Sequence, residues 1–317
     1  MELIRGIHNI RARHHGCVLT IGNFDGVHRG HQALIEQLKL EGQRLGVPVM
    51  VMIFEPQPLE LFAGDKAPAR LTSLRDKAKY LAECGVDYLL CVRFEPRFAA
   101  NIAQAFVSQL LVEKLGVKFL AVGDDFRFGA GRLGDFPLLQ KAGAEYGFDV
   151  ISTQTFREGE HRISSTGIRD ALRDDDLQLA AHLLGHPFSI SGRVVHGDKL
   201  GRTIGFPTAN VPLKRLVSPV KGVYAVDVLG LSPEPLPGIA NIGIRPTVGG
   251  VRKQLEVHLL DTTMDLYGRH IDVVLRAKLR NEQRFASLDA LKQQIASDEV
   301  TAREFFGLPS PRYTRRT

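Results

Sequence analysis

The sequence has no tryptophan, only three cysteines, and no apolar run as long as a membrane-spanning helix. Because a helix that crosses a bilayer needs about 18 consecutive apolar residues, a membrane-spanning helix is excluded. Cys17, Cys84 and Cys91 form neither an even disulfide set nor a CxxC metal pair. Residues 1–16 are basic but lack the apolar segment of a secretory signal. We therefore expect a soluble protein of the cytoplasm with no membrane partner.

Positive charge is in moderate excess, since 41 Lys and Arg stand against 35 Asp and Glu, a net charge of +6. An excess of this size suits polyanionic small molecules as well as nucleic acid. An RNA-binding β-barrel, one alternative function, would interleave exposed aromatic and basic residues on its strands. Residues 220–280 lack such a pattern, so we expect no nucleic-acid partner.

Residues 1–183 alternate short apolar runs with amphipathic helical patterns, and we predict that they form one domain. The predicted strands are 17–21, 47–54, 86–92, 118–122 and 148–153. The predicted helices are 31–45, 74–84, 102–115 and 136–146. Regular strand–helix–strand alternation indicates right-handed βαβ units and therefore a Rossmann-like α/β domain with a parallel sheet.

Residues 184–317 differ in pattern from the first domain, because glycine and proline separate short β-rich runs. The predicted strands are 192–195, 223–229, 238–242, 255–260 and 271–279. Strands at this spacing are typical of a small antiparallel β-barrel or sandwich. Two helices, 287–296 and 301–306, are expected to follow. The predicted fold class is thus α/β plus β, with the second domain beginning at residue 184.

The most informative motif is TIGNFDGVHRGHQALI, residues 20–35, in which a strand, a glycine-bearing turn and a helix start follow one another. The helix N-terminus offers free N–H groups and a positive dipole to a phosphate. His28 and His31 can both face that anion and stabilise charge on a reacting phosphorus centre. A zinc pair is less favoured, because only Asp25 stands nearby at ligand spacing.

The second motif is ISSTGIR, residues 163–169, which begins another helix. Its hydroxyl groups can simply cap that helix. Ser165, Thr166 and Arg169 can also bind a triphosphate, with the arginine as a fork. HxGH followed by ISSTxxR resembles the HxGH nucleotidylyltransferase superfamily, whose members join a phosphate or carboxylate to the α-phosphate of a nucleotide and expel pyrophosphate. An enzyme of this kind acting on another phosphate is a further alternative.

Two more segments follow predicted strands, namely FEPQP at 54–58 and GDDFRFG at 123–129. Ligands of open parallel sheets bind at the carboxyl ends of the strands, so both segments are candidates for a binding site. A GxGxxG match at 129–134 does not predict a dinucleotide site, since DDFRF separates it from its strand and Pro137 follows.

The barrel half contains GDKLGRTIGFPTANV, residues 197–211, whose glycines and basic residues suit phosphates. Thr208 and Asn210 lie two residues apart, so in an extended segment both oxygens share a face and can meet one Mg²⁺. Taken alone, PTAN is better explained by an ordinary turn, which Pro, Thr and Asn favour. Downstream, Glu256 alternates with apolar neighbours and is expected to project into a barrel mouth as a general base. A solvated surface carboxylate is the alternative.

Taken in order, the motifs resemble the family of bacterial bifunctional riboflavin kinases/FMN adenylyltransferases, also called FAD synthetases. They include GNFDGVHRGH, FEPQP, KAPARLTSLRDK, GDDFRFGAGR, ISSTGIR, GRVVHGDKLGRTIGFPTANV, KGVYAV, NIGIRPTVGG, LEVHLLD and RNEQRFASLDAL, which together span nearly the whole chain. The resemblance implies a C-terminal kinase that converts riboflavin to FMN with ATP and Mg²⁺. It also implies an N-terminal adenylyltransferase that joins FMN to AMP from a second ATP and releases FAD and pyrophosphate.

The resemblance also implies roles for individual residues. Catalysis is assigned to His28, His31, Arg169 and Glu256. ATP in the first site is assigned to Gly22, Asn23, Phe24, His28, His31, Ser165, Thr166 and Arg169. ATP in the kinase is assigned to Lys199, Gly201, Arg202, Gly205, Thr208 and Asn210, with Thr208 and Asn210 at the metal. The flavin is assigned to Phe54, Pro56, Pro58, Asp125, Phe126 and Arg127. Many relatives have histidine where this sequence has Gln57, so no proton role is carried over to that position.

Overall fold

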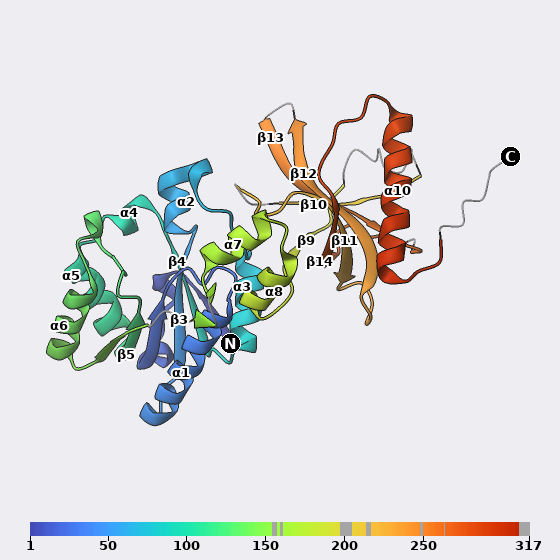
Figure 1. The fold of residues 1–317 in the computed structure, drawn as a ribbon. Helices are drawn as coiled ribbons and strands as arrows, with labels where there is room; N and C mark the ends of the chain where they lie inside the picture. The colour runs from blue at the N-terminus through green and yellow to red at the C-terminus, as the bar shows by residue number, and fades with distance from the viewer. Residues whose placement is uncertain are drawn as a thin grey trace. The chain divides into compact units, whose positions relative to one another are not determined.

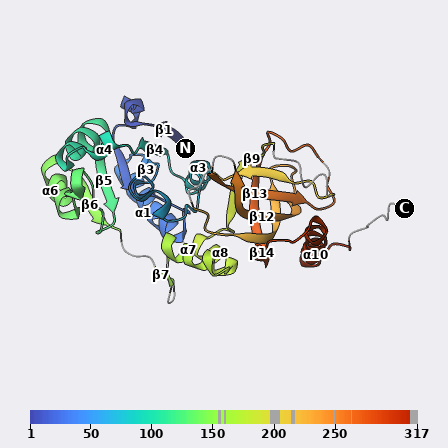
Figure 2. The same cartoon turned by 90° about the horizontal axis from the view of Figure 1, so that it is seen from above.

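The computed structural model describes residues 1–153, 157–158, 161–196, 205–213, 217–247, 250–262 and 264–310. The chain divides into two compact units, Met1–Gly167 and Ile168–Thr317 (Figure 1, Figure 2). No helix in these described ranges is long and apolar enough to cross a membrane.

The first unit contains the predicted parallel sheet, in the strand order β1-β4-β3-β2-β5-β6. The strands are β1 (Glu2–Arg5), β2 (Cys17–Ile21), β3 (Val49–Glu55), β4 (Tyr88–Arg93), β5 (Val117–Val122) and β6 (Asp149–Ser152). A two-stranded hairpin is formed by β7 (Arg157–Glu158) and β8 (His161–Arg162). The edge strand β1 was not predicted.

Helices cover both faces of this sheet, as expected for βαβ units. They are α1 (Arg29–Leu45), α2 (Pro58–Ala63), α3 (Leu74–Glu83), α4 (Pro96–Ala99), α5 (Ala103–Ala105), the π-helix η4 (Phe106–Lys114) and α6 (Phe136–Tyr146). Short 3₁₀ turns are η1 (Ile7–Asn9), η2 (Ala12–His14), η3 (Gly64–Lys66) and η5 (Ala130–Arg132). The single helix predicted over 102–115 is therefore α5 followed by a π-helix.

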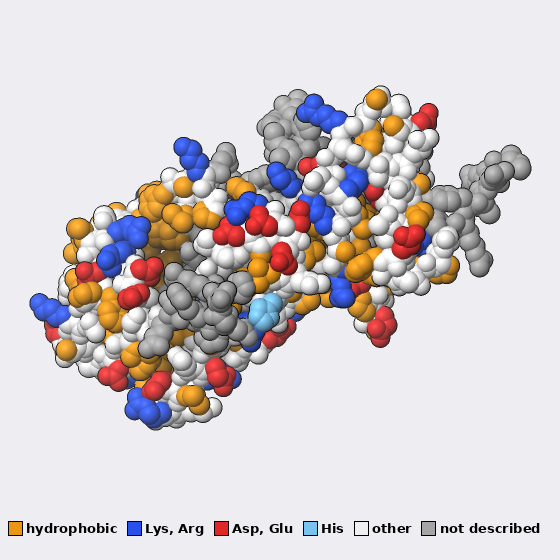
Figure 3. All heavy atoms as spheres, viewed as in Figure 1, with side chains coloured by type: hydrophobic (Ala, Val, Ile, Leu, Met, Phe, Trp, Pro, Cys, Tyr) orange, Lys and Arg blue, Asp and Glu red, His pale blue; other side chains and the backbone are white. Residues whose placement is uncertain are grey.

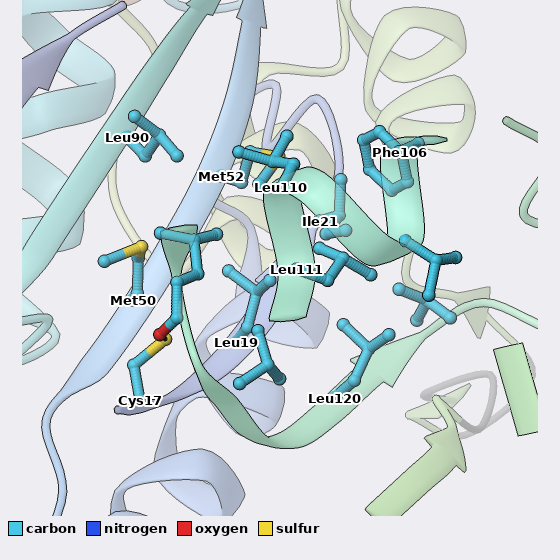
Figure 4. Close-up of a cluster of buried hydrophobic side chains, with 14 of the residues drawn as sticks. Cys17, Leu19, Ile21, Met50, Met52, Leu90, Phe106, Leu110, Leu111 and Leu120 are labelled. Atoms are coloured by element: carbon cyan, nitrogen blue, oxygen red, sulfur yellow. Dashed lines mark hydrogen bonds between the residues drawn. The ribbon is translucent and has the colours of Figure 1, made fainter. Parts of the chain in front are cut away.

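Two apolar layers hold the sheet. On one face, Ile35 of α1 and Leu81 of α3 pack against β3 and β4. On the other face, η4 and α6 pack against the central strands, and Figure 4 shows Leu110 and Leu111 of η4 among the side chains of β2 and β3. Strand β2 lies between β3 and β5, and the chain proceeds from β2 to β3. The carboxyl ends of β2 and β5 therefore form the topological switch point, where open sheets bind ligands.

The second unit is the predicted antiparallel barrel, with strand order β10-β13-β12-β11-β14-β9. The strands are β9 (Ser189–Arg193), β10 (Ala209–Pro212), β11 (Gly222–Leu229), β12 (Leu236–Thr247), β13 (Gly250–Leu259) and β14 (His270–Arg280). A hydrogen bond of 2.8 Å from the N–H of Val195 to the carbonyl of Asn210 links the two ends of the sheet. Buried side chains such as Tyr224 and Val257 fill the interior.

One long helix, α10 (Leu288–Phe306), packs on the barrel, so the expectation of two separate helices was wrong. No glycine or proline interrupts residues 297–300. Asp298 is nearly buried in this segment and accepts hydrogen bonds of 2.7–3.0 Å from Arg280 of β14. This ion pair fixes the middle of the helix at the point where the prediction ended the first of the two.

The compact units divide earlier than residue 183, the predicted end of the first domain. Helix α7 (Ser165–Arg173) begins in the first unit, and α8 (Leu177–Leu184) belongs to the second. In the turn between them, Asp175 accepts a hydrogen bond of 2.6 Å from the ammonium of Lys278 on β14. This charge pair fastens the helical connection to the barrel, and the predicted domain boundary at 183/184 stays a prediction.

Candidate functional site

The turn after β2 is tightly constrained. Phe24 and Val27 have positive φ angles of 47° and 43°, which L-residues rarely adopt. The nearly buried carboxylate of Asp25 accepts hydrogen bonds from the N–H groups of Leu71, at 3.0 Å, and Thr72, at 3.1 Å, and from the hydroxyl of Thr72 at 3.3 Å. Backbone strain of this kind persists only where surrounding contacts over-determine it. Asp25 therefore holds the turn in shape, a role that sequence reasoning did not assign.

The turn places His28 and His31 at the start of α1. The Nδ1 of His28 accepts a hydrogen bond of 3.4 Å from the N–H of His31 and so caps the helix. The two imidazole rings stack with centroids 3.6 Å apart, and the ring of Phe24 lies 4.6 Å from that of His31. The structure thus brings the predicted pair together at the helix N-terminus.

The protonation state of His31 follows from its surroundings. Burial lowers the pKa of this imidazole well below its usual value, and the nearby His28 and Lys77 lower it further. Lys77 itself has no exposed surface, and among the described residues its Nζ has no hydrogen-bond partner. Burial also lowers the pKa of this ammonium, against the attraction of Asp25. At neutral pH the imidazole of His31 is therefore uncharged.

The ISSTGIR motif meets this turn. The hydroxyl of Ser165 donates a hydrogen bond of 2.8 Å to the carbonyl of Asp25. A Cβ on Gly30 would lie 3.2 Å from His28 Nδ1 and 3.5 Å from the carbonyl of Ile163, so only glycine allows this approach without a shift. Ser164 instead caps the helix, because its hydroxyl accepts a hydrogen bond from the N–H of Gly167.

Four further residues predicted for the first site are less constrained. Asn23 and Thr166 are exposed, and Gly22 is partly exposed at the end of β2. Arg169 follows Ser165 by one turn of α7 but belongs to the second compact unit. A role for Arg169 at the phosphates therefore stays a prediction.

A row of seven phenylalanines follows the carboxyl ends of β3, β4 and β5, and we call it the phenylalanine row. Its members are Phe54, Phe62, Phe94, Phe98, Phe106, Phe126 and Phe128. Successive ring centroids are 5.1–6.5 Å apart. Phe54 and Phe126 were predicted, whereas the others were missed, although Phe94 directly follows a strand. Phe62 stands at one end of the row with 69% of its surface exposed.

The other predicted flavin residues surround this row on loops. Asp125 and Arg127 are exposed, and the guanidinium of Arg127 donates to the carbonyl of Phe126 at 3.2 Å. Pro56 is exposed and Pro58 is the first residue of α2. Hydrophobic side chains gather around α2 and α4 on the surface in Figure 3. Because aromatic and apolar side chains dominate this part of the first unit, it suits a flat apolar ligand better than a charged one.

In the second unit, strand register creates a polar row. Asn210 of β10 stands opposite Glu256 of β13, which stands opposite Asn241 of β12. Directly opposed residues share a face, and the neighbours Leu255 and Val257 point to the barrel interior. Glu256 therefore lies on the outer face, so its expected position in the barrel mouth was wrong. Asn241 was missed, because its place depends on pairing between distant strands.

The metal prediction rests on Thr208 and Asn210, whose oxygens are ligands that Mg²⁺ accepts. Asn210 is nearly buried, and its Oδ1 accepts a hydrogen bond from the amide of Gln254. Its Nδ2 lies 3.5 Å from the carbonyl of Thr208. Gln254 thus orients the amide beside the threonine. Within the described part of the chain, no group of three His, Cys, Asp or Glu side chains is placed to hold a metal ion.

A cavity of 580 Å³ opens beside Thr208. It is lined by Val194, Pro207, Thr208, Ala209, Val257, Leu259, Thr262, Met264, Asp265, Leu266 and Tyr267. The ring of Tyr267 stacks on that of His196, with centroids 3.8 Å apart. Of the glycine-rich loop predicted to cover phosphates, Lys199, Gly201 and Arg202 lie outside the described residues, whereas Gly205 is exposed with a φ of 92°.

Comparison with known proteins relates both sites to one family. A family model described as FAD synthetase matches residues 10–167, and one described as riboflavin kinase matches residues 184–306. The bifunctional riboflavin kinase/FMN adenylyltransferase of Escherichia coli (strain K12) is 76% identical over 312 residues, 98% of this chain and 100% of that protein. The protein of the same name from Pseudomonas fluorescens is 54% identical over 304 residues, 96% of this chain and 97% of that one.

A solved structure covers the same length. The crystal structure of a macrolide-efflux protein from Streptococcus pneumoniae has a TM-score of 0.76 and 29% identity, and the match covers 96% of this chain and 99% of that one. The two family matches support neither the RNA-binding barrel nor a nucleotidylyltransferase for another phosphate. Since both family models match and the relatives are aligned over nearly their whole length, the chain belongs to the family of bifunctional riboflavin kinases/FMN adenylyltransferases.

Proposed function

We propose that this chain makes FAD from riboflavin in two ATP-dependent steps. In the second unit, the 5′-hydroxyl of riboflavin attacks the γ-phosphate of ATP, which gives FMN and ADP. In the first unit, the phosphate of FMN attacks the α-phosphate of another ATP, which gives FAD and pyrophosphate. The single observation that carries this proposal is the match of both halves to separate family models, one for each reaction.

The adenylyl transfer needs no nucleophile from the protein, because FMN supplies one. The work left to the protein is positioning and stabilisation of charge on the α-phosphate. His28 and His31 supply imidazole nitrogens at the N-terminus of α1, where the helix dipole also favours an anion. Since His31 is neutral, it acts as a hydrogen-bonding group rather than as a fixed cation.

The phenylalanine row is the proposed site for the isoalloxazine ring of FMN. Aromatic rings bind flat ligands by stacking and edge contacts, and Phe62 is exposed enough to take part. Asp125 and Arg127 border the row on the loop after β5. This loop and the turn after β2 start from adjacent strands, which supports flavin and ATP binding at one edge of the sheet.

For the kinase, we propose Glu256 as the general base that takes the proton of the riboflavin 5′-hydroxyl. Thr208 and Asn210 would hold Mg²⁺ together with phosphate oxygens of ATP, since Mg²⁺ is usually bound by few protein ligands plus substrate phosphates. The bound metal would neutralise charge that develops on the transferred phosphate. Gln254 keeps the Asn210 amide in place, and the cavity beside Thr208 is the proposed site of the adenine base.

We further propose that the protein acts in the cytoplasm. Both reactions consume ATP, and Cys17, Cys84 and Cys91 carry unpaired thiols, which are typical of reducing compartments.

One assay tests the proposed function. The pure protein is incubated with riboflavin, ATP and Mg²⁺, and the flavins are separated by chromatography. We expect FMN to appear first and FAD to follow, and we expect FAD and pyrophosphate when FMN replaces riboflavin. Absence of FAD in the second reaction would refute the adenylyltransferase, and absence of FMN in the first would refute the kinase.

A further inference from the structure

Helix α2 stands at the flavin edge of the first unit without any buried side chain of its own. Leu59, Leu61 and Phe62 are all exposed, the last with 69% of its surface. Most helices are held in place by an apolar face that packs on the core. The position of α2 must therefore depend on other contacts.

Arg70 supplies those contacts. Its Nη1 donates to both carboxylate oxygens of Glu55, at the end of β3, at 2.8 and 3.0 Å. Its Nε donates at 2.9 Å to the carboxylate of Glu60 in the first turn of α2, and Nη2 binds the same carboxylate. The side chains of Arg70 and Glu60 are each 12% exposed, so solvent screens this pair only weakly.

Glu60 also fixes the start of the helix. Its Oε2 accepts a hydrogen bond of 2.9 Å from the N–H of Gln57, the residue before α2. Half a turn beyond Glu60, the ring of Phe62 packs edge-on against Phe94 with centroids 5.8 Å apart. One guanidinium thus ties the end of β3 to the helix that carries the exposed end of the phenylalanine row.

We propose that Arg70 is a positioning residue for the flavin substrate of the adenylyltransferase: by pairing with Glu55 and Glu60 it fixes α2, and thereby holds Phe62 where it contacts the isoalloxazine ring. This inference rests on the proposed function of the first site. Arg70 touches neither ATP phosphates nor reacting atoms in this scheme, so its loss weakens FMN binding rather than chemistry.

The first test is Arg70→Met, which keeps an unbranched chain and removes the paired charge. We expect the KM for FMN to rise about three- to tenfold, the scale of one lost aromatic contact, with kcat and the KM for ATP within about twofold. Arg44→Met is the matched control, because Arg44 pairs with Glu41 on an exposed part of α1 and should change neither constant. A fall in kcat at unchanged KM for FMN would overturn the proposal.

The second test is a double-mutant cycle with Phe62→Ala. If Arg70 acts through Phe62, the double variant has the KM of Phe62→Ala alone, whereas additive effects would contradict the proposal. Should Arg70→Met leave no folded first unit, Glu60→Gln replaces it; a rise in the KM for FMN supports the proposal and an unchanged KM refutes it. Failure of the unsubstituted protein to make FAD would instead refute the proposed function.

Discussion

The proposed ATP sites of the two units are built on unlike surfaces. In the first, one strand, one turn and one helix start place His28 and His31 within a short stretch of sequence. In the second, Asn210, Asn241 and Glu256 come from three strands and meet only through antiparallel register on the outer face of a barrel. The residues of one proposed phosphate site are thus brought together by local backbone geometry, and those of the other by long-range strand pairing. It also predicts that the two sites fail separately.

The largest expected effect is that of Glu256→Ala on the kinase. Loss of a general base typically costs about 10²- to 10⁴-fold, so FMN formation from riboflavin should nearly stop. FAD formation from added FMN should be unchanged, because the carboxylate lies in the other unit. Initial rates of both reactions, measured on the same preparation, check this. Equal loss of both rates would contradict separate sites.

The converse variant combines His28→Ala with His31→Ala. We expect FAD formation to fall about 10²- to 10³-fold, as when charge-stabilising donors are removed, while FMN accumulates from riboflavin. The time course of the flavins by chromatography gives the result. FAD at the rate of the unsubstituted protein would show that the stacked imidazoles are not part of the site.

Stability distinguishes the two units further, because α10 combines apolar packing with a nearly buried ion pair, whereas no charged side chain is buried in α1. Arg280→Met leaves the nearly buried carboxylate of Asp298 without its main partner and should lower the free energy of unfolding by about 2–3 kcal/mol. Urea unfolding measures the loss, with Arg276→Met as a control, since 47% of the Arg276 side chain is exposed in its pair with Asp227. Equal effects would mean that burial of Asp298 does not matter.

The smallest expected effect concerns pH. The pKa of His31 is lower in the folded than in the unfolded protein, so below about pH 6.5 the unfolded chain binds the proton first. The free energy of unfolding should therefore fall as pH drops from about 6.5 toward the pKa of His31 in the folded protein. Above about pH 6.5, His31 should make stability no more dependent on pH. His31→Gln should flatten this dependence in thermal melts. A His31→Gln curve parallel to that of the unsubstituted protein would refute the buried, neutral imidazole.

Sequence reasoning succeeded where the signal is local. The turn and helix start around His28, the parallel sheet and the barrel followed from strand–helix alternation and turn residues. Only two of the seven members of the phenylalanine row were predicted, because rings such as those of Phe62 and Phe94 meet through the neighbouring positions of β3 and β4. The outer-face position of Glu256 was missed for the same reason, since alternation along one strand does not tell which of its two faces points into the barrel.

The decisive measurement mixes two proteins that are each unable to complete the pathway from riboflavin to FAD. Glu256→Ala alone should leave riboflavin unconverted, and the His28→Ala/His31→Ala variant alone should stop at FMN. Combined in one tube with riboflavin, ATP and Mg²⁺, they should produce FAD, because FMN released by one variant is adenylylated by the other. A mixture that still ends at FMN, or never reaches it, would contradict two independent ATP-using sites in one chain.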